Sequence, residues 1–280
     1  MNVWVTEWQT PDVGLSLKVK AVLWQERTPY QELAVVDTEA YGRVLLLDGA
    51  IQTTDRDEYV YHEMITHVPL TVHPHPRRVA VIGGGDGGTI REILKHPEVE
   101  EVHLVEIDER VVEASRRFFP RIAEKLDDPR VHLHFTDGIA WVRDARNFDV
   151  ILVDSTDPVG PAEGLFTPAF YASLAAALGP DGIATVQSES PFLQADLIRR
   201  IHTGMRASFA GVYLYLANVP TYPSGLWSFT LGSKGPDPGA ARPGPAGMAT
   251  RYWSPEVQAA AFRLPVFVQE LVRAEEPAQP

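Results

Sequence analysis

The chain of 280 residues contains no cysteine. This absence excludes disulfide bridges, thiolate metal sites and a cysteine nucleophile. The sequence also has no apolar run that approaches the ~20 residues of a membrane-spanning helix. Its first residues, MNVWVTEWQTPD, lack the basic start and apolar core of a secretory signal. We therefore expect a cytoplasmic protein with no membrane partner.

Positive charge is scarce as well. The chain has 25 Lys and Arg against 37 Asp and Glu, which gives a formal net charge of −12. Such a balance argues against nucleic acid and anionic membranes as partners, and it is compatible with a cationic ligand. The 45% of hydrophobic residues is ordinary for a globular protein, and the length allows a large and a small domain.

The first sixty residues alternate short strand-like segments with turns. Three segments are rich in β-branched residues: LSLKVKAVLWQE, YQELAVVDTE and GRVLLLDGAIQTT. They predict a small antiparallel sheet. The next segment, DEYVYHEMITHVPL, has helical spacing. We predict an N-terminal β-sheet domain over residues 1–66 and a Rossmann-like catalytic domain over residues 67–280.

From Arg78 the pattern changes to alternating strands and helices. Apolar strands such as RVAVIGGG, EEVHLVEID and FDVILVDS alternate with helical segments such as ERVVEASRRFF and PAFYASLAAAL. This pattern predicts an α/β, doubly wound fold, with a parallel sheet covered on both faces. GVYLYLANVP and LWSFTLGS then predict an antiparallel pair, and SPEVQAAAFRLPVFVQELVRA a closing helix.

The segment GGGDGG (residues 83–88) follows a predicted strand and precedes a predicted helix. Gly83, Gly85 and Gly88 fit the spacing G-x-G-x-x-G, and Glu106 lies about 20 residues further on, where an acid can bind both ribose hydroxyls. This context indicates a ligand that contains adenosine. The structural alternative is a tight turn that needs glycine for packing, with Glu106 as a helix cap.

Asp86, inside the glycine loop, argues against a dinucleotide. A fixed carboxylate at this helix end would repel a pyrophosphate, at a cost of several kcal/mol in a cleft of low dielectric constant. The same carboxylate would attract an ammonium group. It would also disfavour S-adenosylmethionine, which carries a carboxylate, relative to the decarboxylated form, which does not.

Six segments together resemble the spermidine synthases, a family of polyamine aminopropyltransferases: GGGDGG, VEID, TDG, DSTDPVGPAEGLF, PTYPSGLW and DGAIQTTDRDEYVYHEM. The resemblance implies a small N-terminal β-domain and a methyltransferase-like Rossmann domain, assembled as a homodimer or homotetramer. It implies transfer of an aminopropyl group from decarboxylated S-adenosylmethionine to putrescine, which gives spermidine and methylthioadenosine. The donor is a co-substrate, so the resemblance implies no cofactor and no metal.

The resemblance also implies roles for individual residues. Glu106 would hold the ribose, Asp137 and Gly138 the adenine edge, and Asp86 the donor's ammonium. Gln31 and Pro161 would complete the nucleoside pocket.

On the acceptor side, the resemblance makes Asp154 the proton acceptor at the attacking amine, assisted by Tyr61. His62, Asp157 and Tyr222 would line the diamine tunnel, and Glu189 would bind the far amine through water.

The chemistry explains why such residues are needed. A sulfonium is a good leaving group, so catalysis consists of holding an unprotonated amine in line with the carbon–sulfur bond. An alkylammonium has a pKa near 10 and an ordinary aspartate near 4, so the proton transfer is uphill by about 6 units. Burial of Asp154 would raise its pKa and narrow that gap, whereas surrounding acids would stabilise the ammonium and widen it. We predict that Asp154 is essential, whether it stores the proton or relays it to water.

Other interpretations use the same residues. Asp154 and Asp157 also suit turns, His62 suits a buried helix position, and Tyr61 and Tyr222 suit a core. Three other functions fit parts of the sequence: a small-molecule methyltransferase, a nicotinamide dehydrogenase and a non-catalytic polyamine sensor. Cadaverine, agmatine and spermidine are alternative acceptors.

Overall fold

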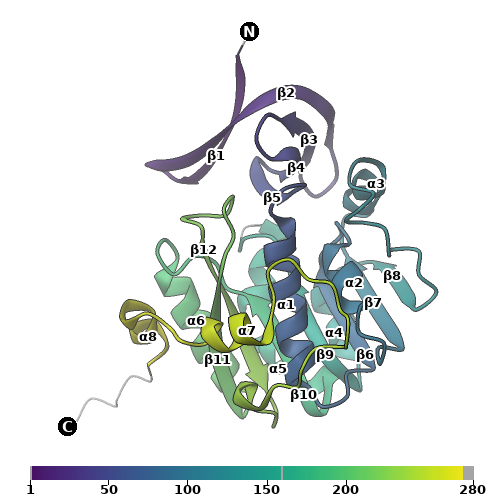
Figure 1. Cartoon of the computed structure of the whole chain (residues 1–280), viewed down its shortest axis with the longest axis vertical. Coiled ribbons are helices and arrows are strands. Elements are labelled where there is room, and N and C mark those ends of the chain that lie inside the picture. The colour runs from purple at the N-terminus through teal and green to yellow at the C-terminus, as the bar shows by residue number, and fades with distance from the viewer. Residues whose placement is uncertain (1, 159, 274–280) are drawn as a thin grey trace.

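The computed structural model of the chain describes residues 2–158 and 160–273, which form two sheets (Figure 1). The smaller sheet is antiparallel, with its strands in chain order: β1 (Val3–Thr10), β2 (Val13–Arg27), β3 (Glu32–Thr38), β4 (Gly42–Leu47) and β5 (Ala50–Thr54). The predicted antiparallel sheet is confirmed. The third predicted segment folds as two strands around a turn at Asp48 and Gly49, and β1 is an additional strand.

The smaller sheet is covered on both faces, which explains the apolar run at the end of β4. Leu45 and Leu47 pack against helix α3 (Glu109–Phe118). Val44 and Leu46 point to the opposite face, in a cluster with Leu17 of β2. Because successive side chains of a strand alternate between faces, a strand buried on both sides needs apolar residues at every position.

The larger sheet has seven strands in the order β11-β12-β10-β9-β6-β7-β8. Their bounds are β6 (Arg78–Gly83), β7 (Glu101–Glu106), β8 (Val131–Phe135), β9 (Phe148–Asp154), β10 (Leu178–Gln187), β11 (Gly211–Asn218) and β12 (Leu226–Ser233). The strands from β10 to β8 are parallel, and β12 is antiparallel to both β10 and β11. The predicted doubly wound sheet and its antiparallel pair are confirmed.

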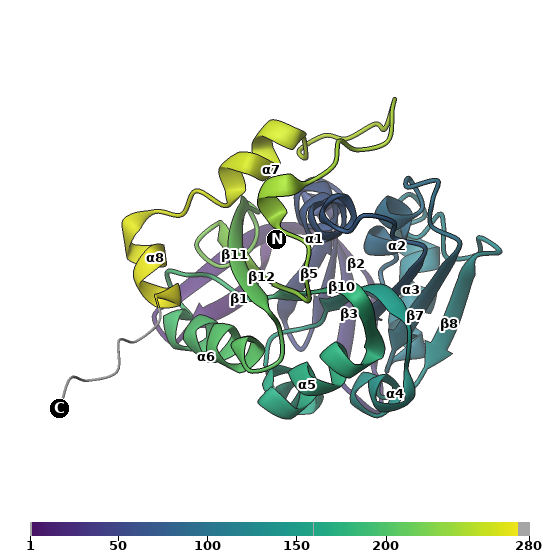
Figure 2. The same ribbon diagram turned by 90° about the horizontal axis from the view of Figure 1, so that it is seen from below.

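Helices cover both faces of the larger sheet (Figure 2). On one face lie α1 (Glu58–Val72) and α2 (Gly88–Ile93); on the other lie α4 (Gly138–Asp144), α5 (Pro168–Ala177) and α6 (Ala195–Arg206). The side chains of β6 alternate accordingly: Val79 and Val81 join the cluster of α2, and Ala80 and Ile82 join that of α4 to α6. Burial on both faces accounts for the continuous apolar strands.

The prediction of one closing helix was wrong. The segment forms two short helices, α7 (Pro255–Ala261) and α8 (Val266–Val272). Pro265 separates them, because a proline disfavours the helical conformation of the residue before it. Two 3-10 helices complete the fold, η1 (Gly160–Phe166) and η2 (Pro238–Ala240). No helix of the described residues is both long and apolar enough to cross a membrane.

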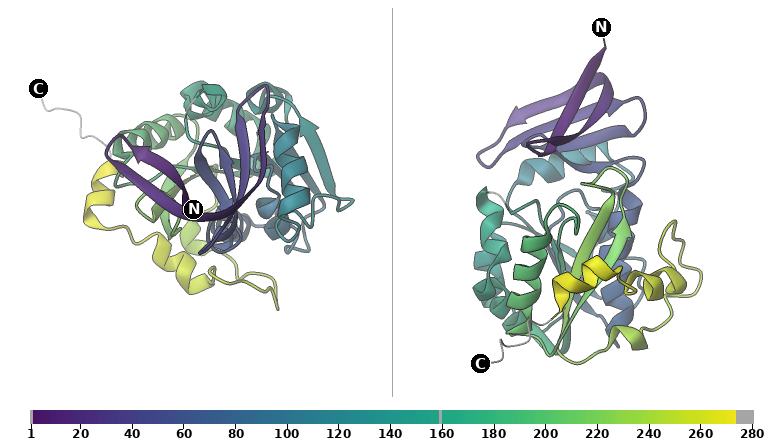
Figure 3. Two further views of the ribbon diagram at one scale, coloured as in Figure 1. Left: turned by 90° about the horizontal axis from the view of Figure 1, so that it is seen from above. Right: turned by 90° about the vertical axis from the view of Figure 1, so that its left-hand side faces the viewer.

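The strand order changes direction between β6 and β9. From β6 the chain continues to β7 and β8 on one side, and from β9 to β10 on the other. Ligands of open α/β sheets bind at such a point, beyond the carboxyl ends of the strands. The smaller sheet stands over this end of the larger domain (Figure 3, right). Residues of both sheets line one cavity there, among them Leu45, Ile51 and Gly83.

Asp57 ties the smaller sheet to the larger domain. It is buried between β5 and α1, where one carboxylate oxygen accepts a hydrogen bond from Thr54 at 2.6 Å. The other accepts from the backbone N–H and the hydroxyl of Thr221, at 2.9 and 2.8 Å, in the β11–β12 connection. The predicted domain boundary after residue 66 lies inside α1 and stays a prediction.

We expect Asp57→Ala to lower the free energy of unfolding by about 3 kcal/mol, because it leaves three buried donors without their acceptor. Urea unfolding followed by tryptophan fluorescence, at one fixed protein concentration, measures this change. Asp12→Ala, at an exposed turn position, is the control and should stay within about 0.5 kcal/mol. A loss below about 1 kcal/mol for Asp57→Ala would show that Asp57 does not join the two parts.

Candidate active site

A cavity of about 450 Å³ lies between the smaller sheet and the carboxyl ends of β6, β7 and β9. The structure brings ten of the predicted site residues to its wall: Gln31, Tyr61, His62, Asp86, Glu106, Asp137, Gly138, Asp154, Asp157 and Tyr222. Glu189 does not line this cavity. The side chain of Pro161 lies outside the described residues.

The cavity wall is strongly acidic. Seven carboxylates line it: Glu7, Asp48, Asp86, Glu106, Asp137, Asp154 and Asp157. Its described lining includes no lysine and no arginine. Charges of one sign in a partly buried cleft raise the local concentration of ligands of the opposite sign. The cavity is therefore suited to cationic ligands.

Asp154 ends β9 at the switch point, beside the glycine loop. Its backbone carbonyl oxygen lies so close to Gly83 that a Cβ there would be 2.2 Å from it, and Gly83 has a φ of +83° that side chains disfavour. The Asp154 side chain accepts a hydrogen bond from the Thr89 hydroxyl at 2.6 Å. Burial and the charge of Asp86 raise the pKa of Asp154, against the opposing effects of His62, Thr89 and Tyr61. A raised pKa favours a proton acceptor.

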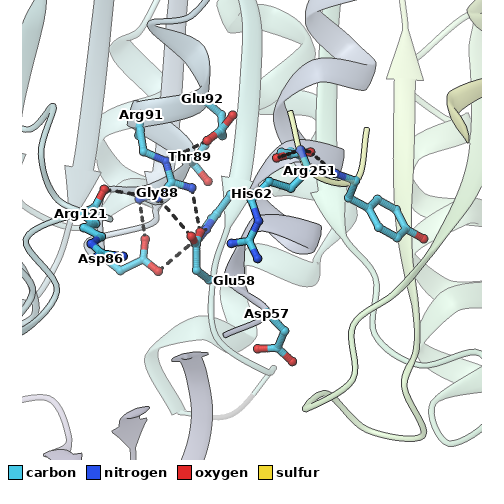
Figure 4. Close-up of polar contacts among 12 residues, drawn as sticks. Asp57, Glu58, His62, Asp86, Gly88, Thr89, Arg91, Glu92, Arg121 and Arg251 are labelled. Carbon is cyan, nitrogen blue, oxygen red and sulfur yellow. Dashed lines mark hydrogen bonds and ion pairs between the residues drawn. The ribbon is translucent and has the colours of Figure 1, made fainter. Parts of the chain in front are cut away.

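His62 lies between two carboxylates (Figure 4). Its Nδ1 is 2.5 Å from Glu58 and its Nε2 is 3.2 Å from Asp86. Burial would lower the pKa of His62, but Asp86 and Glu58 outweigh burial and hold that pKa well above its usual value. Burial would likewise raise the pKa of Asp86, and His62 lowers it. The group is therefore a buried imidazolium paired with two carboxylates. A Cβ on Gly88 would lie 2.2 Å from the His62 ring, so the first position of α2 requires glycine.

Arg91 continues this network away from the cavity (Figure 4). Its guanidinium binds both oxygens of Glu58, at 2.8 and 3.1 Å, and Nε binds Glu92 at 2.8 Å. Burial would raise the pKa of Glu58, but the hydrogen bonds and charges of His62 and Arg91 lower it. Arg91 thus keeps Glu58 ionised, and Glu58 fixes the orientation of the His62 ring.

The nucleoside side of the cavity is built from strand and helix ends. Glu106 ends β7, and its carboxylate accepts backbone N–H groups of Asp108 at 2.9 Å and Gly85 at 3.2 Å. Burial raises the pKa of Glu106 to about 7. Asp137 caps α4 by accepting the N–H of Ile139 at 2.8 Å.

Gln31 reaches this side of the cavity from the β2–β3 connection. Its side-chain amide donates to Asp108 at 2.9 Å, which fixes its position.

A second cavity of about 200 Å³ adjoins the first and shares Glu7, Asp48, Ala50, Asp157 and Pro223 with it. Glu189 lines this smaller cavity. It is buried and adopts a φ of +66°, a strained conformation for a glutamate. Burial and the neighbouring Asp157 raise the pKa of Glu189 well above its usual value. Burial also raises the pKa of Glu7, to about 7.

Tyr61 and Tyr222 add aromatic rings to the acidic cavity wall. Tyr222 donates to the backbone oxygen of Gln52 at 2.6 Å and packs edge-on against Trp227, with 4.7 Å between the ring centroids. The Tyr61 ring lies 5.5 Å from that of Tyr222. Burial, and then the charge of Asp154, raise the pKa of Tyr61 well above its usual value. Tyr61 therefore stays a neutral hydroxyl donor beside Asp154.

Sequence reasoning missed several residues of the site. Glu58 had a signal that could have been used, because it precedes His62 by four residues, about one helical turn. Arg91 had none, because only the fold brings it to Glu58. Thr89 follows the glycine loop directly. Glu7 had no signal, because only the fold of the smaller sheet over the crevice brings it to Asp157.

We expect Glu7→Gln to stabilise the protein at alkaline pH. Because the folded-state pKa of Glu7 is about 7, against an ordinary value of 4.5, Glu7 lowers stability progressively as the pH rises from about 4.5 to 7, and the full cost remains above pH 7. The substitution should raise the free energy of unfolding by on the order of 3 kcal/mol at pH 8 and by less than about 1 kcal/mol at pH 5. Urea unfolding at both pH values measures this, with Glu39→Gln at an exposed position as the control. Equal effects at both pH values would contradict the prediction.

Comparison with known proteins gives two family matches. Residues 58–239 match the spermine/spermidine synthase domain, and residues 3–55 match the spermidine synthase tetramerisation domain.

Curated relatives match over nearly their whole length. A polyamine aminopropyltransferase of Moorella thermoacetica is 56% identical over 278 residues, 98% of each chain. One of Bacillus subtilis is 49% identical and covers 97% of this chain and 99% of its own.

Solved structures are similar too. The crystal structure of a spermidine synthase in complex with the transition-state analogue AdoDATO superimposes with a TM-score of 0.94 at 38% identity, covering 96% of this chain and 94% of that one. The spermidine synthase from Thermotoga maritima gives 0.91 at 37% identity, with the same coverage. By these matches the chain belongs to the spermine/spermidine synthase family of aminopropyltransferases.

Proposed function

We propose that this aminopropyltransferase moves the aminopropyl group of decarboxylated S-adenosylmethionine to putrescine and releases spermidine and methylthioadenosine. The observation that supports this most is the wall of seven carboxylates with no lysine or arginine among its described residues. Both substrates are cations, and neither carries a carboxylate. The names of the relatives, polyamine aminopropyltransferase and spermidine synthase, support the same reaction class.

The donor would lie along the carboxyl ends of β6, β7 and β8. Glu106 would accept hydrogen bonds from the ribose hydroxyls, and Asp137 with Gly138 would meet the adenine edge. Gln31 would close this pocket from the smaller sheet, with Pro161 as predicted from the sequence. Asp86 would bind the donor's ammonium, and this role would explain the presence of a carboxylate inside the glycine loop. S-adenosylmethionine would bring its own carboxylate to Asp86 and be repelled.

The acceptor would extend from Asp154 toward the smaller cavity. Tyr61 and Tyr222 would flank its methylene chain, and Asp157 would face its charged end. Burial and Asp157 raise the pKa of Glu189 and so favour its protonated form. The far ammonium of the diamine would supply a positive charge that replaces this proton. Glu7, whose pKa is about 7, would respond in the same way.

Asp154 would accept a proton from the near amine before that amine attacks the carbon next to sulfur. The Thr89 hydroxyl donates to Oδ2 of Asp154 and holds the carboxylate in place. Burial of Asp154 raises its pKa and so narrows the gap of about 6 units between an ordinary aspartate and an alkylammonium. The new carbon–nitrogen bond forms as the carbon–sulfur bond breaks, and the sulfonium becomes a neutral thioether.

Product analysis tests the reaction. The protein is incubated with decarboxylated S-adenosylmethionine and putrescine, and spermidine and methylthioadenosine are measured by mass spectrometry. Parallel reactions contain cadaverine, agmatine or spermidine as the acceptor, or S-adenosylmethionine as the donor. Faster turnover of another amine would overturn the choice of putrescine, and methyl transfer would overturn the reaction class.

We expect the two acids at the reacting centre to have separable effects. Asp154→Asn should lower kcat by about 10²- to 10⁴-fold, because it removes the proton acceptor. Asp86→Asn should raise KM for the donor by at least about tenfold, because it removes the partner of its ammonium. The dissociation constant of methylthioadenosine, which has no ammonium, should change less than threefold in both. Asp12→Asn is the control, and unchanged turnover in both variants would refute these roles.

We expect donor binding to release a proton from His62. The donor's ammonium at Asp86 would repel the His62 imidazolium, so its pKa should fall on binding. Calorimetry at pH 7.5, in two buffers of different ionisation enthalpy, measures the number of protons released on binding. Decarboxylated S-adenosylmethionine should release nearly one proton more than methylthioadenosine does. The measurement is made on the Asp154→Asn variant, so that Asp154 does not contribute to the proton release. If the excess persists after His62→Gln is added, His62 is not its source.

The smaller sheet is also the proposed assembly surface. Residues 3–55 match a tetramerisation domain, and the side chains of Trp4 and Val22 on this sheet are 56% and 60% exposed. We propose a homotetramer that forms through this sheet and acts in the cytoplasm. Sedimentation equilibrium measures the subunit number, and a monomer at micromolar concentration would refute the assembly.

A further inference from the structure

A cluster of histidines lies at the edge of the larger sheet, outside the site described above. Neighbouring strands β7 and β8 contribute Glu101, His103 and His132. The Nε2 atom of His103 is 2.6 Å from Oε1 of Glu101, and Nε2 of His132 is 3.9 Å from the same oxygen. All three ligand atoms lie within 4.8 Å of one another. Among the described residues, this is the single group of three such atoms close enough to share an ion.

The strand register explains why these side chains converge. His103 pairs with His132 across the parallel β7–β8 ladder, so their side chains leave the same face of the sheet. Glu101 lies two residues before His103 and His134 two residues after His132, which puts all four on that face. β8 is the edge strand of the sheet (Figure 1). The His132 side chain is 51% exposed, so solvent and ions reach the cluster.

Two of the three side chains are already oriented by contacts on their far side. Nδ1 of His103 is 2.9 Å from Nε2 of His134, and Oε2 of Glu101 accepts from Arg78 at 2.7 Å. Histidines that bind metals nearly always have such a partner at their other nitrogen, and bound carboxylates are hydrogen-bonded in turn. Both contacts leave Nε2 of His103 and Oε1 of Glu101 directed at each other.

We infer that Glu101, His103 and His132 form a binding site for a divalent cation of the zinc class. Two imidazoles and one carboxylate suit zinc, nickel and copper, whereas magnesium and calcium prefer oxygen ligands alone. Ligand atoms around a tetrahedral zinc lie about 3.3 Å apart, given bonds near 2.0 Å. Small side-chain rotations would reach this arrangement. They would lengthen the distance of 2.6 Å between His103 and Glu101 and shorten the distance of 3.9 Å between His132 and Glu101. Water would occupy the fourth position.

Protonation and charge set the expected affinity. Arg78 donates a hydrogen bond to Oε2 of Glu101 at 2.7 Å, which stabilises the carboxylate and leaves Oε1 for the ion. Zinc binds only the neutral form of a histidine side chain, so protonation competes with the ion and binding should weaken as pH falls. The positive charge of Arg78 opposes any cation. We therefore expect micromolar affinity rather than the tighter binding of closed zinc sites.

The cation would link the edge strand β8 to its neighbour β7 through side chains of both strands. His103 lies three residues before Glu106, about 10 Å along the strand, so the ion would not touch the reacting groups. Binding to the folded chain alone raises the melting temperature by mass action. The inference does not depend on the proposed reaction, and its test does not use enzyme activity.

Zinc titration of the full chain, without a polyhistidine tag and freed of metal, tests the site. We expect one equivalent to bind with micromolar affinity at pH 7.5, at least tenfold weaker binding at pH 6, and a higher melting temperature. Cobalt(II) should give the visible absorption of a site with nitrogen and oxygen ligands. Magnesium at the same concentration should change neither measurement.

Variants locate the site. His132→Ala should abolish the binding of one equivalent of zinc, as should His103→Ala. Because the His132 side chain is exposed, its replacement should leave the fold intact. His134→Ala should weaken it by about 10- to 100-fold through the lost orientation of His103. His75→Ala, at an exposed position elsewhere, is the matched control and should bind like the parent chain. Unchanged binding in His132→Ala and His103→Ala, or affinity no tighter than millimolar in the parent, would overturn the inference.

Discussion

Buried carboxylates without lysine or arginine partners are the constraint on which the site depends. Removal of a carboxylate from water is costly, and the protein meets that cost by shifting pKa values rather than by adding bases. Burial raises the pKa of Glu7, Glu106, Asp154 and Glu189. Glu7 and Glu106, whose pKa values are about 7, can therefore change protonation when a cationic or hydrogen-bonding group binds beside them. An arginine in the wall would have stabilised the empty protein and competed with the substrate.

Asp86 is the exception, because its pKa is lowered and a buried histidine balances its charge. The chain from Asp86 through His62 and Glu58 to Arg91 alternates negative and positive groups. Each member compensates its neighbour, so the network is stable without a ligand. A ligand ammonium at Asp86 would weaken both pairs of His62, and Arg91 would still neutralise Glu58. The glycine at position 88 is required because the His62 ring occupies the space of a side chain.

The alternation of apolar strands and helices predicted the doubly wound sheet, and the glycine loop with Glu106 indicated the nucleoside side of the site, because both are local patterns. Most of the other site residues followed only from the resemblance of six segments to the spermidine synthases. Glu7 could not be predicted, because its position in the site depends on how a separate sheet covers the crevice. The resemblance predicted that Glu189 binds the far amine through water. Glu189 lines the smaller cavity that adjoins the first, and its role stays a prediction. The break at Pro265 was visible in the sequence, but the apolar spacing on both sides concealed it.

The enclosure of the crevice links function to assembly. Gln31, Glu7 and the Gln52 carbonyl reach the cavity from the smaller sheet, and Asp57 and Tyr222 hold that sheet to the larger domain. The same sheet matches a tetramerisation domain. Contacts between subunits that hold this sheet in place would therefore also keep the acids at the far end of the acceptor in register with Asp154. Because a displacement of about 1 Å at a reacting centre costs about a hundredfold in rate, assembly would serve catalysis without adding a residue to the site.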